Sequence, residues 1–393
     1  MQFEFSTAAR IVFGPGSVRE AGAIAAAFGR RAFVVTGASP DRLAPLLGPL
    51  AEAGIAHERF AVQGEPTVDL VGRGVDAAQA GGVDVVIGFG GGSAIDAAKA
   101  IAAMLGNGGD LLEHLEVIGA GRPLDRASVP WIAIPTTAGT GSEVTRNAVL
   151  ASPAHRVKVS LRSPSMLARV ALVDSGLTAS LPPGTTAGSG LDALTQLIEP
   201  FTSSRRNPLA DGFCREGMAR AGRSLRRAFE AARTGTPAPD ARDDMSLAAL
   251  LGGLALANAG LGAAHGFAAP IGGRFDAPHG AVCGRLLPAV VAVNVAALER
   301  RAASGEPSAR ATLARYDEAA RIVLREPSAT TPDLVAWLVD LVDALGVPRL
   351  TAYGAKDADI PELVAAGASA SSMQANPVRL APEELVEILE RSM

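Results

Sequence analysis

The residues best suited to chemistry in this chain are three side chains that could hold a divalent metal ion. Asp192 lies in the segment GLDALTQLIE, while His265 and His279 bound the glycine-rich segment HGFAAPIGGRFDAPHG. One carboxylate and two imidazoles form a reasonable donor set for a divalent ion, with positions left open for water and substrate. The alternative for each histidine is a satisfied core residue or a surface residue. The pattern indicates a metal site but does not establish one.

A second candidate is a glycine-rich turn that could bind phosphate. The apolar run VDVVIG leads into Gly88-Phe89-Gly90-Gly91-Gly92-Ser93 and then into the helical pattern SAIDAAKA. Consecutive glycines let the backbone approach a ligand closely, and the start of a helix favours an anion such as a pyrophosphate. The alternative is a tight turn in which Ser93 caps the helix. Asp96 and Lys99 follow in the next turns as cofactor contacts or as ordinary charges.

A third candidate is the polar loop that follows the apolar run WIAI. It reads PTTAGTGSEVT over residues 135–145 and combines hydroxyl groups with glycines. In open α/β sheets, ligands bind at the carboxyl ends of the strands, which is where this loop would lie. The loop is therefore predicted to bind a ligand, and the alternative is a turn rich in helix caps.

The elements that must position these residues form two regions. Residues 31–36, 83–88, 131–134 and 170–174 are predicted strands, and 41–54 and 93–105 are predicted helices. Buried strands that alternate with helices predict a parallel sheet with helices on its faces. Past residues 182–186 the chain favours helices, over 192–201, 208–233, 245–264 and 331–345. We expect an α/β domain over 1–183 and an all-helical domain over 184–393.

Composition excludes several classes of protein. The 393 residues are 48% hydrophobic, which provides a core for two domains and argues against extensive disorder. A net charge of −4 and 4% aromatic residues argue against nucleic-acid binding. The N-terminus has no signal-peptide pattern, and two cysteines give no disulfide framework, so we expect a cytoplasmic protein. The apolar stretch 247–264 is interpreted as a buried helix and not as a membrane span, because it is built from Ala and Gly.

Taken together, GGGSAIDAAKA, PTTAGTGSEVT, GLDALTQLIEPF and HGFAAPIGGRFDAPHG resemble the iron-containing (group III) alcohol dehydrogenases, over essentially the whole chain. The resemblance implies the dehydroquinate synthase-like fold, with the active site in the cleft between an α/β and a helical domain. It also implies the cofactor-binding residues. Gly90, Gly91, Gly92 and Ser93, with Asp96 nearby, would hold the pyrophosphate, and Thr136, Thr137, Thr140, Thr145 and Lys158 would line the ribose and nicotinamide.

The resemblance further implies a catalytic metal centre made by Asp192, His265 and His279, with Fe²⁺ or Zn²⁺ as the ion. The family's fourth ligand is a histidine one helical turn after the aspartate, where this chain has Gln196. The Gln196 amide oxygen could replace it as a weaker ligand, and a site without metal is the alternative. Many members also carry a histidine at the position of Ala269, so proton exchange here requires another route.

The cofactor preference departs from the family pattern as well. Many members that prefer NAD end the first strand with Val-Thr-Asp, but this chain has Val35-Thr36-Gly37. Without that carboxylate at Gly37 nothing repels a 2′-phosphate, and Ser39 and Arg42 could contact it. The sequence therefore predicts that NADP is accepted and preferred over NAD.

The predicted function is metal-assisted hydride transfer between NAD(P) and a small alcohol or aldehyde, in a homodimer or larger oligomer. Asn147 and Phe267 are expected as pocket walls. Arg146 is expected either to recognise an acidic substrate or to form an ion pair, for instance with Glu65. The alternatives are reduction of an oxo-acid, as in maleylacetate reductases, oxidation of a polyol, as in glycerol dehydrogenases, and a nucleotide-binding protein without turnover.

Overall fold

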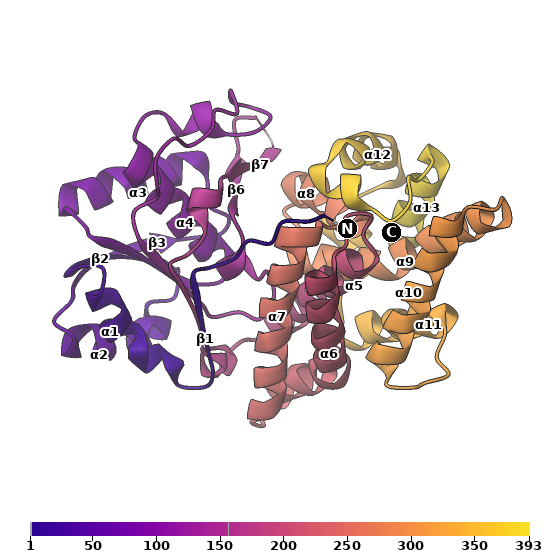
Figure 1. Cartoon of the computed structure of the whole chain (residues 1–393), viewed down its shortest axis with the longest axis horizontal. Coiled ribbons are helices and arrows are strands. Elements are labelled where there is room, and N and C mark those ends of the chain that lie inside the picture. Colours follow the sequence, from indigo (N-terminus) through magenta and orange to yellow (C-terminus); the bar gives the residue numbers. More distant parts are fainter. Residues whose placement is uncertain (1, 156) are drawn as a thin grey trace. The chain divides into compact units, whose positions relative to one another are not determined.

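The computed structural model describes residues 2–155 and 157–393, which form two compact units (Figure 1). The first, called the α/β unit here, comprises residues 6–137 and 141–179. The second, the helical unit, comprises the segment up to Phe5, residues 138–140 and residues 180–393.

The α/β unit is built on a six-stranded sheet with the strand order β1-β8-β5-β4-β2-β3. All pairings within this sheet are parallel, which confirms the predicted fold class. Its strands are β1 (Arg10–Phe13), β2 (Arg31–Gly37), β3 (Ala56–Val62), β4 (Val85–Gly90), β5 (Trp131–Pro135) and β8 (Val170–Val173). A separate antiparallel hairpin is formed by β6 (Asn147–Ser152) and β7 (Val157–Arg162).

Helices cover both faces of the sheet. In Figure 1, α1 (Ala21–Ala26) and α2 (Ala44–Glu52) lie below it, and α3 (Val68–Gly81) and α4 (Gly92–Asn107) lie above it. Alternate residues of β4 explain the two layers. Ile87 and Phe89 are buried in a core shared with α2, whereas Gly88 faces α4 so closely that a Cβ there would lie 2.8 Å from the Cβ of Ala98.

The four predicted strands correspond to β2, β4, β5 and β8, but the sequence analysis missed β1 and β3. β1 has only four residues. β3 is an edge strand that is mostly exposed and carries His57, Glu58 and Arg59, so it lacks the apolar run of a buried strand. Apolar periodicity therefore identified the interior of the sheet and not its edges.

The helical unit consists of nine α-helices within the described residues. These are α5 (Pro183–Thr202), α6 (Pro208–Thr234), α7 (Pro239–Ala259), α8 (Ala263–Phe275), α9 (His279–Ala303), α10 (Pro307–Leu324), α11 (Thr331–Ala344), α12 (Ile360–Ser369) and α13 (Pro382–Ser392). Several begin with proline, whose fixed φ angle suits the first helical position and whose missing N–H would have no partner there. Helix α5 packs against α6, α7 and α9, which places Asp192 inside the unit.

Short 3₁₀ helices connect many of these elements. They are η1 (Ser17–Glu20), η2 (Pro40–Leu43), η3 (Leu111–His114), η4 (Ser142–Val144), η5 (Pro164–Met166), η6 (Ser175–Thr178), η7 (Leu350–Tyr353), η8 (Asp357–Asp359) and η9 (Ser371–Ala375).

Two helices differ from the prediction in ways that affect the site. Helix α5 begins at Pro183, two turns or more before the predicted start. The prediction missed these first turns because they are rich in Gly, Ser and Thr, which have low helix propensity. Gly190 shows why such residues are used, since a Cβ there would lie 2.1 Å from Cδ1 of Leu225 in α6. The single helix predicted over 245–264 is wrong, because α7 ends at Ala259 and α8 begins at Ala263 with a bend of 101°. The break at Gly260, which has a φ of 74°, puts His265 in the first turn of α8.

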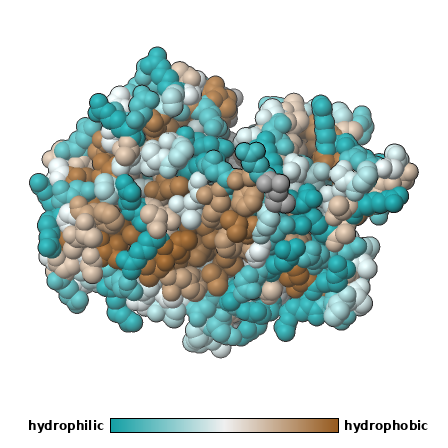
Figure 2. Space-filling view, in the orientation of Figure 1, coloured by the Kyte–Doolittle hydropathy of each residue, from teal (hydrophilic) through white to brown (hydrophobic). Residues whose placement is uncertain are grey.

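Among the described residues, α9 alone is long and apolar enough to cross a bilayer by length and composition, and α7 with α8 pass the same test only as a bent pair. Most of the apolar window of α9, 72%, is buried inside the unit, as expected for a core helix. The visible face of the helical unit is mainly polar (Figure 2).

Candidate active site

The helical unit brings four potential metal-binding groups together. Asp192 lies in the middle of α5, His265 in the first turn of α8, and His279 and Cys283 in the first two turns of α9. One donor atom from each of the four residues lies within 4.8 Å of all the others. Gly280 permits this approach, because a Cβ there would lie 2.2 Å from the carbonyl oxygen of Gly188 in α5. The structure thus places the three predicted residues in one cluster and adds a thiol.

Asp192 faces both imidazoles of this cluster without forming an ordinary hydrogen bond to either. Oδ1 of Asp192 lies 3.4 Å from Nε2 of His265 and 3.7 Å from Nε2 of His279. Both Oδ1 of Asp192 and Nε2 of His265 are buried and have no hydrogen-bond partner. Buried polar atoms without partners are rare and costly, so the cluster has the character of a binding site for a cation.

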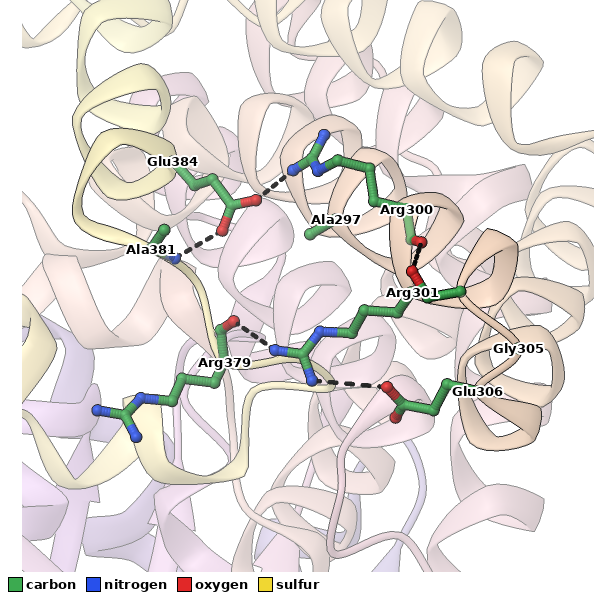
Figure 3. Close-up of a pocket in the computed structure, with 9 residues that line it drawn as sticks. Ala297, Arg300, Arg301, Gly305, Glu306, Arg379, Ala381 and Glu384 are labelled. Atoms are coloured by element: carbon green, nitrogen blue, oxygen red, sulfur yellow. Dashed lines mark hydrogen bonds and ion pairs between the residues drawn. The ribbon is translucent and has the colours of Figure 1, made fainter.

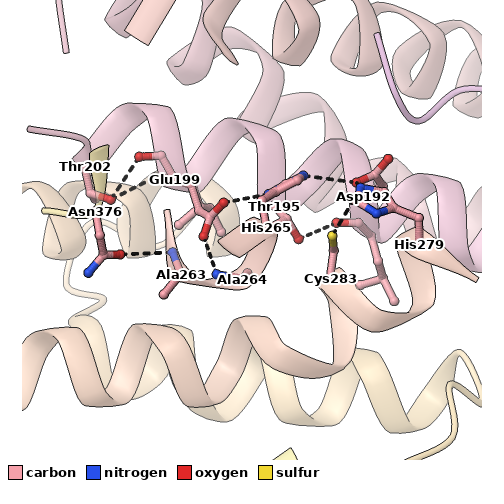
Figure 4. Close-up of polar contacts among 12 residues, drawn as sticks. Asp192, Thr195, Glu199, Thr202, Ala263, Ala264, His265, His279, Cys283 and Asn376 are labelled. Atoms are coloured by element: carbon pink, nitrogen blue, oxygen red, sulfur yellow. Dashed lines mark hydrogen bonds and ion pairs between the residues drawn. The ribbon is translucent and has the colours of Figure 1, made fainter. Parts of the chain in front are cut away.

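Glu199 holds His265 in place (Figure 4). Nδ1 of His265 donates to Oε2 of Glu199 at 2.6 Å, and the backbone N–H of Ala264 donates to Oε1 at 2.7 Å. The N–H of Ala263 donates to Oδ1 of Asn376 at 3.1 Å, so side chains from α5 and from the loop before α13 cap the start of α8. With Nδ1 held by Glu199, Nε2 of His265 is directed at Asp192, which is the arrangement that orients metal-bound histidines in proteins.

The four groups also shift each other's protonation. Burial raises the pKa of Asp192, but the positive charges of His279 and His265 outweigh burial and hold that pKa below its ordinary value. The charge of Cys283 is the main reason that the pKa of His279 rises to about 9. Burial raises the pKa of the Cys283 thiol, yet the two imidazoles outweigh burial and bring it below its usual value. A metal ion would replace the protons that these groups share.

Gln196 lies beside the cluster, one turn after Asp192. Its side chain contributes, after the two imidazoles, to holding the pKa of the Asp192 carboxylate below its ordinary value. Its Oε1 is buried, has no hydrogen-bond partner, and lies against α7, where a Cβ on Gly252 would be 3.5 Å away.

The α/β unit brings some of the predicted cofactor residues together at one edge of its sheet. Gly90 pairs in register with Pro135 at the ends of β4 and β5, and the N–H of Thr136 donates to the carbonyl of Gly90. Gly37 ends β2 beside them, since a Cβ on Gly90 would lie 3.3 Å from the nitrogen of Gly37. A Cβ on Gly91 would lie 3.3 Å from Cγ2 of Thr137. Only small residues allow a ligand to reach this part of the backbone.

The alternative in which Ser93 caps the helix is wrong. The N-cap of α4 is Gly91, which makes no side-chain capping bond, and Ser93 lies within the first turn. The amides at the start of α4 therefore have no side-chain cap, as expected for an anion-binding turn.

Asp96, Thr145 and Asn147 form part of a buried network around Lys99. Nζ of Lys99 donates to the hydroxyls of Ser142 and Thr145 at 3.0 and 2.8 Å, and to the carbonyl of Asn147 at 2.7 Å. Asp96 accepts from the hydroxyl of Ser142 and from the N–H of Val149. Lys99 and Asp96 thus hold the polar loop against α4, a positioning role that the sequence analysis did not foresee.

Other predicted contacts are engaged within the protein. Nζ of Lys158 forms an ion pair with Glu65 at 3.1 Å. Arg42 donates to the carbonyls of Thr136 and Leu177, so its guanidinium contacts backbone in this structure. Ser39 is exposed.

Arg146 and Asn147 are both half-buried, and Asn147 begins β6. Thr140 belongs to the segment 138–140 of the helical unit, where Gly139 packs against Ser189 of α5. These positions remain predictions as cofactor or substrate contacts.

Phe267 does not lie at a surface of the helical unit. Its side chain is fully buried in the core formed by α8, α9, α12 and α13, where Gly367 makes room for its ring. The structure gives Phe267 a role in packing, two residues after His265, and not the position of a pocket wall.

A surface cavity of about 530 Å³ lies elsewhere, between the end of α9 and the start of α13 (Figure 3). It is lined by arginines that already bind internal partners: Arg300 contacts Glu384, and Arg301 contacts Glu306 and the carbonyl of Arg379. Its lining has no histidine or cysteine, and its one hydroxyl, that of Ser304, donates to the carbonyl of Arg300 at 3.1 Å.

Comparison with solved structures defines the class of protein as dehydrogenases and reductases of alcohols and aldehydes. The structure of a 1,3-propanediol oxidoreductase superimposes with a TM-score of 0.90 and 27% identity, covering 100% of both chains. A sulfoacetaldehyde reductase from Bifidobacterium kashiwanohense, solved in complex with NAD⁺, superimposes with a TM-score of 0.85 and 25% identity, covering 100% of this chain and 99% of that one.

Sequence comparison defines the family. The iron-containing alcohol dehydrogenase profile matches residues 8–175, and the profile for the C-terminal part of the Fe-containing alcohol dehydrogenase family matches residues 186–393. The sulfoacetaldehyde reductase of Bilophila wadsworthia (strain 3_1_6) is 31% identical over 99% of both chains. Long-chain-alcohol dehydrogenase 1 of Geobacillus thermodenitrificans (strain NG80-2) is 39% identical over 62% of this chain and 60% of its own length. The chain belongs to the iron-containing alcohol dehydrogenase family, and it is an oxidoreductase that acts on alcohols and aldehydes with a nicotinamide cofactor.

The sequence analysis missed two residues of this site, Glu199 and Cys283. A signal for both was present in the spacing. Cys283 follows His279 by one helical turn, and Glu199 follows Asp192 by about two turns on the same face of α5. Neither spacing is informative until α5, α8 and α9 are known to meet.

Proposed function

We propose that this chain interconverts a small alcohol and its aldehyde by hydride transfer with NADP or NAD, assisted by a divalent ion held by Asp192, His265 and His279. The observation that carries the proposal is the buried cluster in which Oδ1 of Asp192 and Nε2 of His265 face each other without hydrogen-bond partners. When bound, the ion would supply Lewis-acid polarisation of the substrate oxygen, and the nicotinamide would supply or accept the hydride.

The protein's own contribution is position and charge. Asp192 supplies a carboxylate with a lowered pKa, and Glu199 fixes the His265 ring so that Nε2 is available. His279 is the most accessible of the four, with 38% of its side chain exposed, so it marks the side from which substrate would enter. Ala269 carries no titratable group, so proton exchange with solvent would pass through water.

The cofactor edge supports NADP as the preferred nucleotide. Gly90, Gly91, Gly92 and Ser93 would hold the pyrophosphate, because the amides at the start of α4 have no side-chain cap. A Cβ on Gly37 would meet nothing within 4 Å, so the position offers room where a carboxylate would otherwise repel a 2′-phosphate. Comparing kcat/KM for NADPH and NADH tests this preference, and a preference of tenfold or more for NADH would contradict it.

The deciding experiment combines elemental analysis with activity. We expect about one zinc or iron ion per chain, with NADPH-dependent aldehyde reduction lost on chelation and restored on refilling. An Asp192→Asn variant should lose both metal and activity, whereas Asp240→Asn, an exposed carboxylate on α7, should lose neither. Activity without metal would reject the metal role, and neither metal nor activity across a wide panel would favour a nucleotide-binding protein without turnover.

A second candidate is reduction of an aldehyde that carries an acidic group. It is favoured by the similarity to two proteins named sulfoacetaldehyde reductases, one of which matches over 99% of both chains. Arg146, just before Asn147 at the start of β6, is the cation we assign to the acidic group. Arg146→Ala should then raise KM for anionic aldehydes selectively, and an equal effect on neutral aldehydes would argue against recognition.

We also propose that the chain forms a cytoplasmic homodimer or larger oligomer. Among the described strands, β1 is an edge strand with a neighbour on one side only, and its Phe13 is partly exposed. The charged residues of β3, the other edge strand, disfavour its pairing with a strand of another chain. Light scattering on the purified protein tests the oligomer, and a monomer at micromolar concentration would reject it. Both cysteines of the chain are free, which fits a reducing compartment.

A further inference from the structure

We propose that Cys283, and not Gln196, supplies the fourth protein ligand of the metal site, so that the ion is held by Asp192, His265, His279 and a thiolate and is preferentially zinc. The inference rests on the metal site of the proposed function and adds to it one ligand and a metal preference.

The separations in the cluster match the edges of a tetrahedron. With zinc–nitrogen and zinc–oxygen distances near 2.0–2.2 Å and zinc–sulfur near 2.3 Å, neighbouring ligand atoms lie roughly 3.3–3.8 Å apart. Oδ1 of Asp192 lies 3.4 Å from Nε2 of His265 and 3.7 Å from Nε2 of His279. Sγ of Cys283 lies 3.6 Å from Nε2 of His279. Three edges of the coordination polyhedron are therefore already in place.

The orientation of the buried atoms supports the same centre. Nδ1 of His265 is occupied by Glu199, so Nε2 is the nitrogen left to bind an ion. Nε2 of His265 and Oδ1 of Asp192 are both buried without hydrogen-bond partners, and Cys283 is fully buried beside them. The thiol is therefore part of a cluster with two unpartnered polar atoms and is not an isolated cysteine.

Gln196 lies one helical turn after Asp192 on α5, and its Oε1 is buried without a hydrogen-bond partner. That oxygen lies against α7, where a Cβ on Gly252 would be 3.5 Å from it. The amide oxygen therefore faces the neighbouring helix, whereas Sγ of Cys283 faces Nε2 of His279 at 3.6 Å. This geometry assigns the fourth ligand position to the thiol.

The chemistry of the donor set leads to zinc. A carboxylate and a thiolate together neutralise the two positive charges of the ion, which matters because uncompensated charge is costly in a buried site. Binding breaks the S–H bond, forms a sulfur–metal bond and releases the proton to solvent. Thiolate with imidazole in a four-coordinate arrangement is typical of zinc. An amide oxygen from Gln196 in this role would be a harder donor and would bind zinc less tightly.

Cobalt substitution tests the ligand directly. The full-length protein, stripped of metal with a chelator, is titrated with Co²⁺ and its absorption spectrum is recorded. We expect one Co²⁺ per chain, visible bands typical of four coordination, and a near-ultraviolet thiolate-to-cobalt charge-transfer band. Binding of Co²⁺ without that band would overturn the assignment of Cys283 while leaving the metal site intact. Absence of Co²⁺ binding would overturn both the assignment and the proposed metal site.

Variants separate the two candidate ligands. Cys283→Ala should lose the charge-transfer band and at least about 100-fold in metal affinity, since even changes to outer groups cost about 10–100-fold. Cys214→Ala removes the other buried thiol, on α6, and should keep the band. Gln196→Ala should also keep it. Loss of affinity in Gln196→Ala together with full affinity in Cys283→Ala would reverse the assignment.

A measurement on the unmodified protein avoids any question of variant folding. X-ray absorption of the zinc-loaded wild-type protein should show one sulfur scatterer at about 2.3 Å among nitrogen and oxygen scatterers. A fit with nitrogen and oxygen alone would reject Cys283 as a ligand. A sulfur ligand together with no aldehyde reduction would instead uphold the inference and reject the proposed function.

Discussion

Glu199 accepts a hydrogen bond from Nδ1 of His265 at 2.6 Å while its other oxygen caps the start of α8 at Ala264. One carboxylate on α5 thus fixes both the position of α8 and the ring of its histidine. The cluster depends on this bond because His265 must present Nε2, and not Nδ1, to Asp192. Without Glu199 the ring would be free to rotate or to change its tautomer.

We therefore predict that Glu199→Gln lowers metal affinity by about 10–100-fold, the usual effect of losing a partner of a metal-bound histidine. Competition with a chelator of known affinity measures the loss. Glu230→Gln is the control, because Glu230 is an exposed carboxylate on α6 that pairs with Arg233. An unchanged metal affinity in a folded Glu199→Gln protein would show that the bond does not orient the ligand.

Gly37 ends β2 at the cofactor edge, where an added side chain meets no atom within 4 Å. Gly37→Asp should lower kcat/KM for NADPH by about tenfold or more while kcat/KM for NADH is retained. The reason is that a carboxylate there repels a 2′-phosphate and can accept hydrogen bonds from the ribose hydroxyls. Gly37→Asn is the matched control, with the same size and no charge. If kcat/KM for NADPH falls equally in both variants, steric exclusion and not charge is responsible.

Glu143 is buried in the α/β unit, and burial raises its pKa to about 7, against an ordinary value of 4.5. A carboxyl group with a raised pKa in the folded state stabilises the fold at low pH. That contribution is lost as pH rises from the unfolded pKa through the folded one. Glu143→Gln should therefore gain stability relative to wild type as pH rises from about 5 to about 8, by up to about 3 kcal/mol. Denaturant unfolding at both pH values measures the difference, and a constant difference would contradict the raised pKa.

Asp244 joins α6 to α7 by accepting hydrogen bonds from Arg220, Arg223 and Ser224 at 2.6–2.8 Å. Burial raises the pKa of Asp244, but the bonds from Arg223 and Ser224 outweigh burial and hold that pKa below its ordinary value. Its stabilisation is present above the unfolded pKa and is lost as pH falls through the folded one. Asp244→Asn should destabilise the protein by about 2–4 kcal/mol at neutral pH, and by less as the pH falls below the unfolded pKa of an aspartate.

Thermal unfolding of the Asp244→Asn variant and of Asp240→Asn provides the comparison. Asp240 makes an exposed ion pair with Arg227 on the same two helices, and such pairs contribute little. Equal effects of the two substitutions would mean that burial of Asp244 adds nothing to its contribution to the stability of the fold.

Local sequence pattern was sufficient to predict the interior of the sheet, the glycine turn that opens α4 and three residues of the candidate metal cluster. Short apolar runs rich in β-branched residues favour buried strands, so β2, β4, β5 and β8 were predictable from local pattern. Asp192, His265 and His279 were identified from residue type and family resemblance, and the structure brings them together. These properties are local, because each depends on a short stretch of chain and its immediate neighbours.

The surroundings of those residues depend on long-range packing that no local pattern encodes. Tertiary packing interrupted the expected helix 245–264 at Gly260 and placed Phe267 in the core. It paired Lys158 with Glu65 and set Gln196 beside the cluster. It also brought Cys283 of α9 to Asp192 of α5. The reason is that α5 and α9 meet through packing of small residues such as Gly188 and Gly280. The distances between side chains on different helices are fixed by such packing and not by spacing along the chain.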